Sequence, residues 1–215
     1  MRFLYMTHKY HLPSLSLICL ITILMTNCAP QKDGVNSLAR DSVPVADSLK
    51  SFGTTAAAVP SEPEFKVDNK FQQQVGDVFT SYVVLKEILV ASDSSSVADK
   101  SGAVMTALDK VDLELLSGDA EDKGRQYFSS LKNLAADIHA SGEIENQRRA
   151  FSELSDSLYL TIKAFGLGGK QAFYDFCPMA FNQEGAFWLS DQEPIRNPYF
   201  GDKMLTCGEV KEKLK

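Results

Sequence analysis

Apolar residues recur every three or four positions between residues 67 and 165, a spacing that places them on one face of a helix. Three polar breaks rich in Ser, Gly and Asp interrupt the pattern. The pattern therefore predicts four amphipathic helices, over about residues 67–91, 97–116, 120–140 and 143–165. Four such helices with short connections favour an all-α fold, an antiparallel up-down four-helix bundle.

The pattern changes after the fourth helix, where the glycines of residues 166–169 stop it and an aromatic-rich tail begins. Residues 172–181 and 186–189 are two short apolar runs with a turn-forming segment between them. These runs predict a small β-hairpin packed on the bundle. A short terminal helix is expected over residues 203–215.

The first 28 residues have the features of a lipoprotein signal peptide. The apolar run over residues 15–25 is too short for the roughly 20 residues that a membrane-spanning helix needs. It ends at Met25-Thr26-Asn27-Cys28, the kind of sequence that lipoprotein signal peptidase cleaves before a lipidated cysteine. We therefore expect a signal peptide over residues 1–27 and a lipid anchor on Cys28. The alternative is an ordinary cleaved signal with an incidental cysteine.

A linker and one domain follow the anchor. Residues 28–64 are rich in Ser, Ala, Pro and Val and show no helical or strand period, which predicts a flexible linker. Residues 65–215 are then a single domain of ordinary size. This organisation predicts a location in the cell envelope, with the lipid holding the domain at the periplasmic side of the outer membrane.

Charge and histidine content bear on two classes of function. The chain has 22 basic and 28 acidic residues, and loss of the two basic residues of the signal leaves 20 against 28, a net charge near −8. Such an acidic chain without a basic run argues against a nucleic-acid partner. His139 is the only histidine outside the signal, which excludes a catalytic zinc site built from several histidines.

Sulfur-bearing residues of the tail are the candidate chemistry. Cys177 and Met179 lie two positions apart, so their side chains share one side of an extended segment. Met204 and Cys207 lie three positions apart and share a face of a helical turn. Thiolates and thioethers brought together select Cu(I) or Ag(I) over hard cations. His139, near the end of the third predicted helix, is an additional candidate ligand.

The two cysteines have a competing interpretation. In an oxidising compartment, Cys177 and Cys207 can pair as a disulfide. That bond would close a loop of about 30 residues, which the chain-entropy model values at about 3.5 kcal/mol. A disulfide removes the thiolates that a metal needs, and the spacing leaves both interpretations open.

The residues give little support to an enzyme. A cysteine nucleophile needs a base, and His139 is the only histidine of the domain. Residues 177–180 lack the second cysteine of a thioredoxin-type pair, and the chain has no phosphate loop, serine elbow or metalloprotease helix. We expect Arg148 and Arg149 on a solvated face with salt bridges, and Trp188 as a core anchor of the tail.

Several segments of the chain carry a family resemblance. They are residues 147–151 (QRRAF), 154–155 (LS), 177–180 (CPMA), 185–190 (GAFWLS), 195–201 (IRNPYFG) and 204–208 (MLTCG). Over about residues 65–215 the chain resembles a small helical domain of unknown function. That domain occurs in bacterial lipoproteins and at the C-terminus of the periplasmic adaptor (membrane-fusion) subunits of copper and silver efflux pumps.

The resemblance implies handling of heavy metals in the periplasm, with Cys177, Met179, Met204 and Cys207 as the natural ligands. Together with the anchor, it favours a lipid-anchored module that binds Cu(I) or Ag(I) and works with a heavy-metal efflux pump subunit. The alternative is a disulfide-stapled, non-enzymatic interaction domain that docks an envelope or efflux protein.

Overall fold

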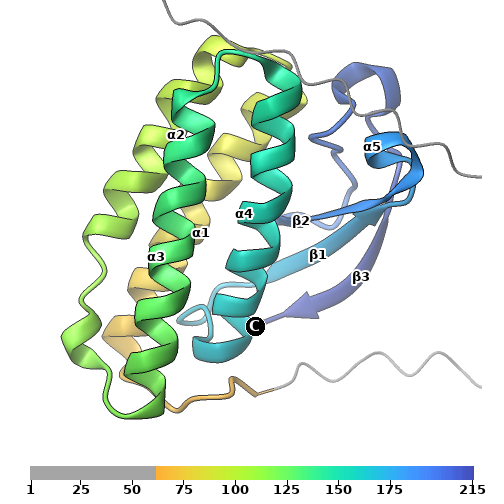
Figure 1. Ribbon diagram of the computed structural model, residues 1–215. Coiled ribbons are helices and arrows are strands. Elements are labelled where there is room, and N and C mark those ends of the chain that lie inside the picture. Colours follow the sequence, from red (N-terminus) through yellow and green to blue (C-terminus); the bar gives the residue numbers. More distant parts are fainter. Residues whose placement is uncertain (1–61) are drawn as a thin grey trace, which may run out of the picture. The chain divides into compact units, whose positions relative to one another are not determined.

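A computed structural model describes residues 62–215, which are mostly helical with a small antiparallel sheet near the C-terminus (Figure 1). The predicted signal peptide, the lipidation site at Cys28 and the linker up to residue 61 lie outside the described residues. The elements in chain order are α1 (Asn69–Val90), α2 (Ser94–Asp109), η1 (Leu113–Leu115), α3 (Asp119–Ala140), α4 (Ile144–Phe165), β1 (Ala172–Cys177), α5 (Ala180–Gln183), β2 (Ala186–Ser190), η2 (Gly201–Met204) and β3 (Glu209–Leu214).

Aspartate side chains cap the N-termini of the first two helices. Asp68 accepts a hydrogen bond from the Lys70 N–H at 2.7 Å, and Asp93 accepts one from the Ser96 N–H at 3.2 Å. These bonds satisfy backbone donors that a helix leaves unpaired at its start. Hydrogen bonds from the hydroxyls of Ser96 and Ser95 also lower the pKa of Asp93 to about 2.

Helix α2 ends earlier than predicted. The apolar spacing continues beyond the helix into a separate turn, which is why the predicted helix is too long. The prediction ran to residue 116, whereas α2 ends at Asp109 and the 3-10 turn η1 follows. The Asp112 side chain caps that turn, and Gln74 of α1 accepts a hydrogen bond from the Asp112 N–H at 3.1 Å. The other three long helices lie within a few residues of their predicted bounds.

The core lies between the long helices. Each helix packs against the next one in the chain, and α1 also packs against α4. Phe71 of α1 meets Phe128 of α3 and Phe165 of α4 edge-on, with ring centroids 5.9 and 5.3 Å apart. Edge-on aromatic pairs of this kind are a favoured geometry, and all three rings are buried.

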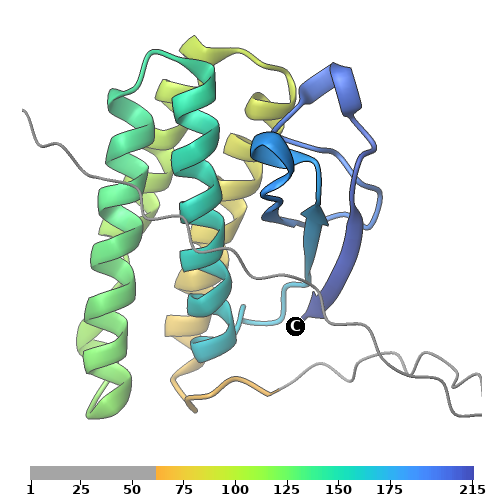
Figure 2. The same cartoon turned by 45° about the vertical axis from the view of Figure 1, so that its right-hand side comes forward.

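The sheet has the strand order β2-β1-β3, with both pairs antiparallel. In Figures 1 and 2 it lies to one side of the long helices, and β2 packs against α4. The predicted hairpin is β1 with β2, and α5 lies in the connection between them. In the register of the sheet, Asp175 of β1 stands opposite Trp188 of β2 and Val210 of β3.

The terminal helix predicted over residues 203–215 is wrong, because this segment forms the end of η2 and the strand β3. The alternating residues of β3 suit an edge strand, and the free edge of β1 supplies its hydrogen-bond partners. The chain enters β3 at Gly208, where φ is 144° and an added Cβ would lie 2.7 Å from the Trp188 ring. The tail is therefore a three-stranded sheet, and the fold is not purely α-helical.

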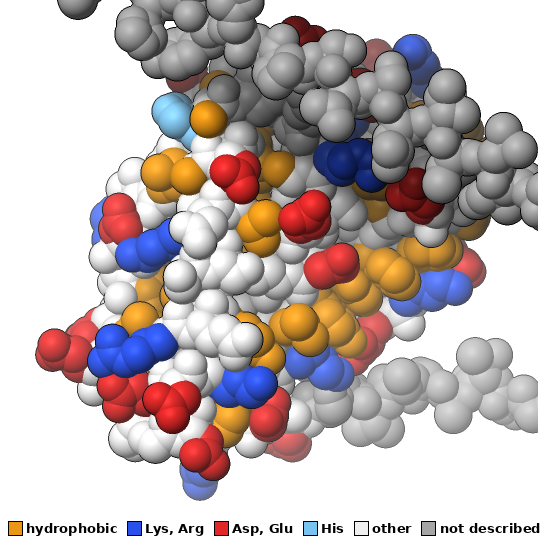
Figure 3. All heavy atoms as spheres, in the orientation of Figure 1, with side chains coloured by type: hydrophobic (Ala, Val, Ile, Leu, Met, Phe, Trp, Pro, Cys, Tyr) orange, Lys and Arg blue, Asp and Glu red, His pale blue; other side chains and the backbone are white. Residues whose placement is uncertain are grey.

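Aromatic rings cover part of the sheet. The rings of Tyr159 of α4, Tyr174 of β1 and Phe187 of β2 are stacked, with successive centroids 3.9 and 4.6 Å apart. The Phe176 ring of β1 is tilted against Phe187, with centroids 4.5 Å apart. Figure 3 shows hydrophobic side chains gathered over the sheet and the neighbouring helix, among charged ones. In the part of the chain that the structure describes, no helix combines the length and the apolar character needed to cross a membrane.

Candidate functional site

The two cysteines of the tail meet. Cys177 is the last residue of β1 and is fully buried, whereas Cys207 lies between η2 and β3 and is half-buried. Their Sγ atoms are 2.8 Å apart, and both are free thiols in the structure. Folding therefore brings together the two residues that both interpretations of the sequence require.

Asn197 holds the segment that carries Cys207. Its side-chain nitrogen donates a hydrogen bond to the Cys207 carbonyl oxygen at 2.7 Å, and its backbone N–H donates one to the Leu205 carbonyl oxygen at 2.8 Å. Its side-chain oxygen accepts a hydrogen bond from the Tyr199 N–H at 2.8 Å. This buried amide fixes the backbone of the thiol-bearing loop.

The contact between the thiols alters the acidity of Cys207. The hydrogen bond with Cys177 raises the pKa of the Cys207 thiol to about 11, and burial adds to the effect. The Cys207 thiol therefore keeps its proton at neutral pH. Any metal that binds it as a thiolate must displace that proton, which makes binding depend on pH.

The two methionines line a common pocket of about 390 Å³. Met179 is 43% exposed and follows β1, while Met204 is 37% exposed and ends η2. The structure thus gathers the four predicted sulfur residues in two pairs: the thiols touch each other, and the thioethers share a solvent-accessible pocket.

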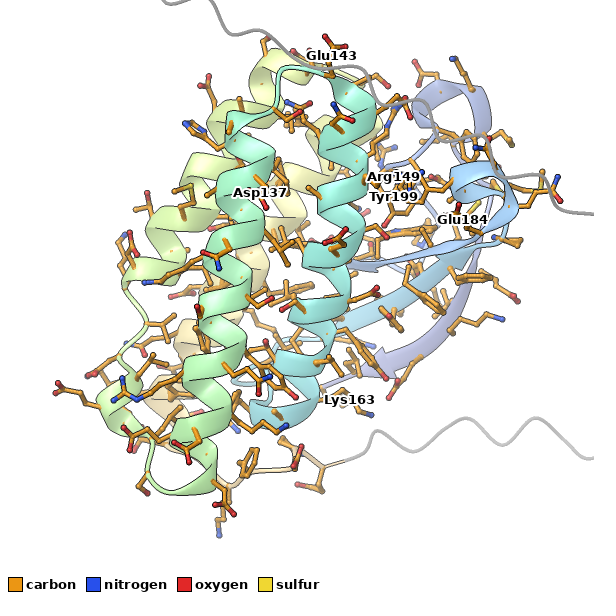
Figure 4. All side chains as sticks on the ribbon, viewed as in Figure 1. Asp137, Glu143, Arg149, Lys163, Glu184 and Tyr199 are labelled. Carbon is orange, nitrogen blue, oxygen red and sulfur yellow. The ribbon has the colours of Figure 1, made fainter. Side chains whose placement is uncertain are left out.

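The wall of the pocket has an unusual backbone. Phe181, Asn182 and Gln183 of α5 have φ values of 51°, 59° and 74°, a left-handed conformation that is costly for residues other than glycine. The Arg149 guanidinium of α4 lies over the Phe181 ring, 4.6 Å from its centroid, and 3.6 Å from a carboxylate oxygen of Glu184. Figure 4 shows Arg149 and Glu184 in the region between α4 and α5, with Tyr199 close by.

His139 lies apart from the sulfur residues. Near the end of α3, its Nδ1 is 2.8 Å from the carbonyl oxygen of Ala98 in α2, and its ring faces Gly102. The predicted fifth ligand is therefore at the contact between α2 and α3. Within residues 62–215, no three His, Cys, Asp or Glu side chains lie close enough together to hold a metal ion.

Arg148 is buried, contrary to the expectation of a solvated face. It donates hydrogen bonds to the carbonyl oxygens of Pro198 at 2.9 Å and Leu89 at 3.4 Å, and to the Ser92 hydroxyl at 2.9 Å. An ion pair with Glu145 at 2.8 Å completes its contacts. Arg148 therefore ties the tail to α1 and α4, whereas Arg149 is exposed as expected.

A buried carboxyl group that no sequence pattern singles out lies in the sheet, two residues before Cys177. Asp175 is fully buried in β1, and neither of its carboxyl oxygens has a hydrogen-bond partner among the described residues. Burial raises the pKa of Asp175 to about 7, although the charge of buried Lys86 opposes the shift. The Nε1 of Trp188, opposite Asp175 in the register, is likewise buried without a described partner.

Comparison with known families gives one match. Residues 78–170 match the model of a family described as a protein of unknown function (DUF3347). The matched region runs from within α1 through α2, α3 and α4 to the loop before β1, so the chain contains a domain similar to one of unknown function. The sulfur residues of the tail lie beyond the match. No curated protein and no solved structure gives a significant match.

Proposed function

We propose that this domain binds a soft metal ion, Cu(I) or Ag(I), with Cys177 and Cys207 as the principal ligands. Met179 and Met204 are weaker thioether ligands, which thiolates can displace. The observation that carries the proposal is the 2.8 Å distance between two thiol sulfurs that come from separate segments of the tail. Soft cations prefer such ligands to oxygen donors. The ion is cargo for a heavy-metal efflux or resistance system, and the domain is not an enzyme.

Binding requires a small movement of the thiols. Metal–thiolate bonds of about 2.3 Å place two sulfurs up to about 4.6 Å apart, so the pair has to separate by up to about 2 Å. Cys177 is fixed in β1, whereas Cys207 lies outside any helix or strand. Because Asn197 holds the backbone at Cys207, we expect the Cys207 side chain to rotate away from Cys177. His139 is not part of this ligand set, because its ring faces the backbone of α2.

The cellular setting belongs to the same proposal. A lipid on Cys28 and the linker of residues 28–64 would tether the domain to the periplasmic side of the outer membrane, where it meets an efflux pump subunit. We also propose that α1–α4 are an antiparallel up-down four-helix bundle. Their short connections and the packing of each helix on the next support that description.

A second candidate function is favoured by the same distance. Two thiols 2.8 Å apart, one of them fully buried, are well placed to form a disulfide in an oxidising compartment. The oxidised domain would then be a stapled interaction module that docks an envelope or efflux protein. Counting free thiols by alkylation and mass spectrometry, on protein purified without reductant, separates the two candidates.

The direct test is an anaerobic titration of the reduced mature chain, in detergent, with Cu(I) in the presence of a competing chelator. We expect one Cu(I) per chain, with an affinity that rises with pH because the Cys207 proton must leave. The matched control is the double variant Cys177→Ser and Cys207→Ser, which keeps Cys28 and both methionines and should bind no Cu(I). Failure of the reduced wild-type chain to take Cu(I) from the chelator would refute the proposal.

A further inference from the structure

The four sulfur residues differ in how far they lie from solvent. Met179 and Met204 are well exposed in one pocket, whereas Cys177 is fully buried and Cys207 is half-buried. Each methionine is joined to a cysteine by a short piece of chain. Met179 is two residues from Cys177, and the Cys207 N–H donates a hydrogen bond to the Met204 carbonyl oxygen at 3.1 Å. A metal that arrives through the pocket therefore meets the thioethers before the thiols.

The pocket is much larger than a bare metal ion. Its volume of about 390 Å³ falls within the range of cavities that hold small molecules. Phe181 and Phe200 line it together with the two methionines, and Arg149 lies at its α4 side. It therefore has room for a ligand group that a metal donor brings with it.

Thioethers suit the first contact with a soft ion. A methionine sulfur is polarisable, its side chain has several rotatable bonds, and it binds without losing a proton. Neither cysteine lines the pocket, and Cys177 is fully buried, so the thiols are less accessible than the thioethers. The exposed methionines are therefore placed to make the first contact with an arriving ion.

We infer that Met179 and Met204 are exchange ligands, which take the metal from a donor complex in the pocket and pass it to Cys177 and Cys207. This inference rests on the proposed metal binding. The donor–metal bonds break as the thioether–metal bonds form, and two thiolates then displace the thioethers. The two thiol protons go to solvent, and the metal keeps its oxidation state, so the transfer needs no oxidant or reductant.

The test is the rate of Cu(I) transfer from its coloured bicinchoninate complex to the reduced mature chain, followed by stopped-flow absorbance. The test variant is Met179→Leu with Met204→Leu, a change that conserves volume. The matched control is Met105→Leu, because Met105 lies in α2, outside the pocket lining. We expect the double variant to slow transfer by about tenfold or more, with a clearly smaller loss of equilibrium affinity, and the control to transfer at the wild-type rate.

Two results would overturn the inference. One is an unchanged transfer rate in the double variant. The other is a loss of equilibrium affinity as large as the loss of rate, which would make the methionines ordinary ligands of the resting site. If the wild-type chain takes up no Cu(I) at all, the proposed function itself fails, and that outcome is recognised before any variant is compared.

A second measurement does not depend on kinetics. Ag(I) is added in small steps to chain labelled with ¹³C at the methionine methyl groups, and the methyl signals are followed by NMR. If Met179 and Met204 are exchange ligands, their methyl signals should broaden or shift at the first additions of Ag(I), while the Met105 signal stays in place. Methyl signals that do not respond at any Ag(I) level would contradict the inference.

Discussion

Replacement of Asp175 by Asn isolates the effect of one buried carboxyl group on stability. The residue stands on β1 against Trp188, and among the described residues its oxygens have no hydrogen-bond partner. An unpaired charge in such a place is costly, so the folded protein favours the protonated form. Asn has nearly the same shape but cannot ionise.

The magnitude follows from the pKa. Burial raises the pKa of Asp175 from 3.8 to about 7, a difference of about 3, and each pKa unit is worth about 1.4 kcal/mol. Between about pH 4 and pH 7 the folded state holds a proton that the unfolded chain gives up, so the stability of the wild type falls as pH rises through this window. The free energy of unfolding of the Asn variant, relative to that of the wild type, should therefore rise by about 2–4 kcal/mol from pH 4 to pH 8.

The assay is urea unfolding at several pH values from 4 to 8, with reductant and a metal chelator in every sample. The difference between the Asn variant and the wild type cancels the contribution of other titrating groups. Asp202→Asn, an exposed position in η2, is the matched control and should change the free energy of unfolding by less than about 0.5 kcal/mol. A flat difference for Asp175→Asn, or one that falls with pH, would refute the reasoning.

Three further changes have defined outcomes. Arg148→Ala should lower the free energy of unfolding by about 2–4 kcal/mol through its lost buried hydrogen bonds, whereas exposed Arg149→Ala should change it by less than about 0.5 kcal/mol; urea unfolding measures both. Oxidation of the thiol pair should raise the free energy of unfolding by about 3.5 kcal/mol, measured with and without dithiothreitol. Gly208→Ala should lower the melting temperature, because φ is 144° there, while Gly142→Ala, where an added Cβ meets nothing, should not.

The sequence predicted the long helices well because their apolar spacing reports directly which face is buried. Apolar residues such as Phe71 and Leu131 recur at helical intervals, and both lie in the core. The spacing of cysteines and methionines also identified the sulfur residues of the tail as candidate ligands. It could not decide whether Cys177 and Cys207 meet, because that contact depends on the pairing of β1 with β3 and on the hydrogen bonds of Asn197.

The sequence did not predict the features that depend on contacts with distant parts of the chain. Strand β3 consists mostly of charged residues, and it is a strand because β1 has a free edge beside it. Burial of Arg148 depends on carbonyl oxygens of the tail and of α1. His139 was grouped with the sulfur residues by residue type alone, and its position against Ala98 shows that residue type does not predict proximity.

The strand order β2-β1-β3 has a consequence for the time course of folding. Helices α1–α4 make contacts between neighbours in the chain, which close short loops and form quickly. β3 has to return across the whole tail to reach β1, and the segment that leads into it carries Cys207. Local opening of β3 should therefore cost less than global unfolding, and its amide protons should exchange faster than those of the helices. Buried Cys177 would then react with solvent reagents through this local opening, while α1–α4 stay folded.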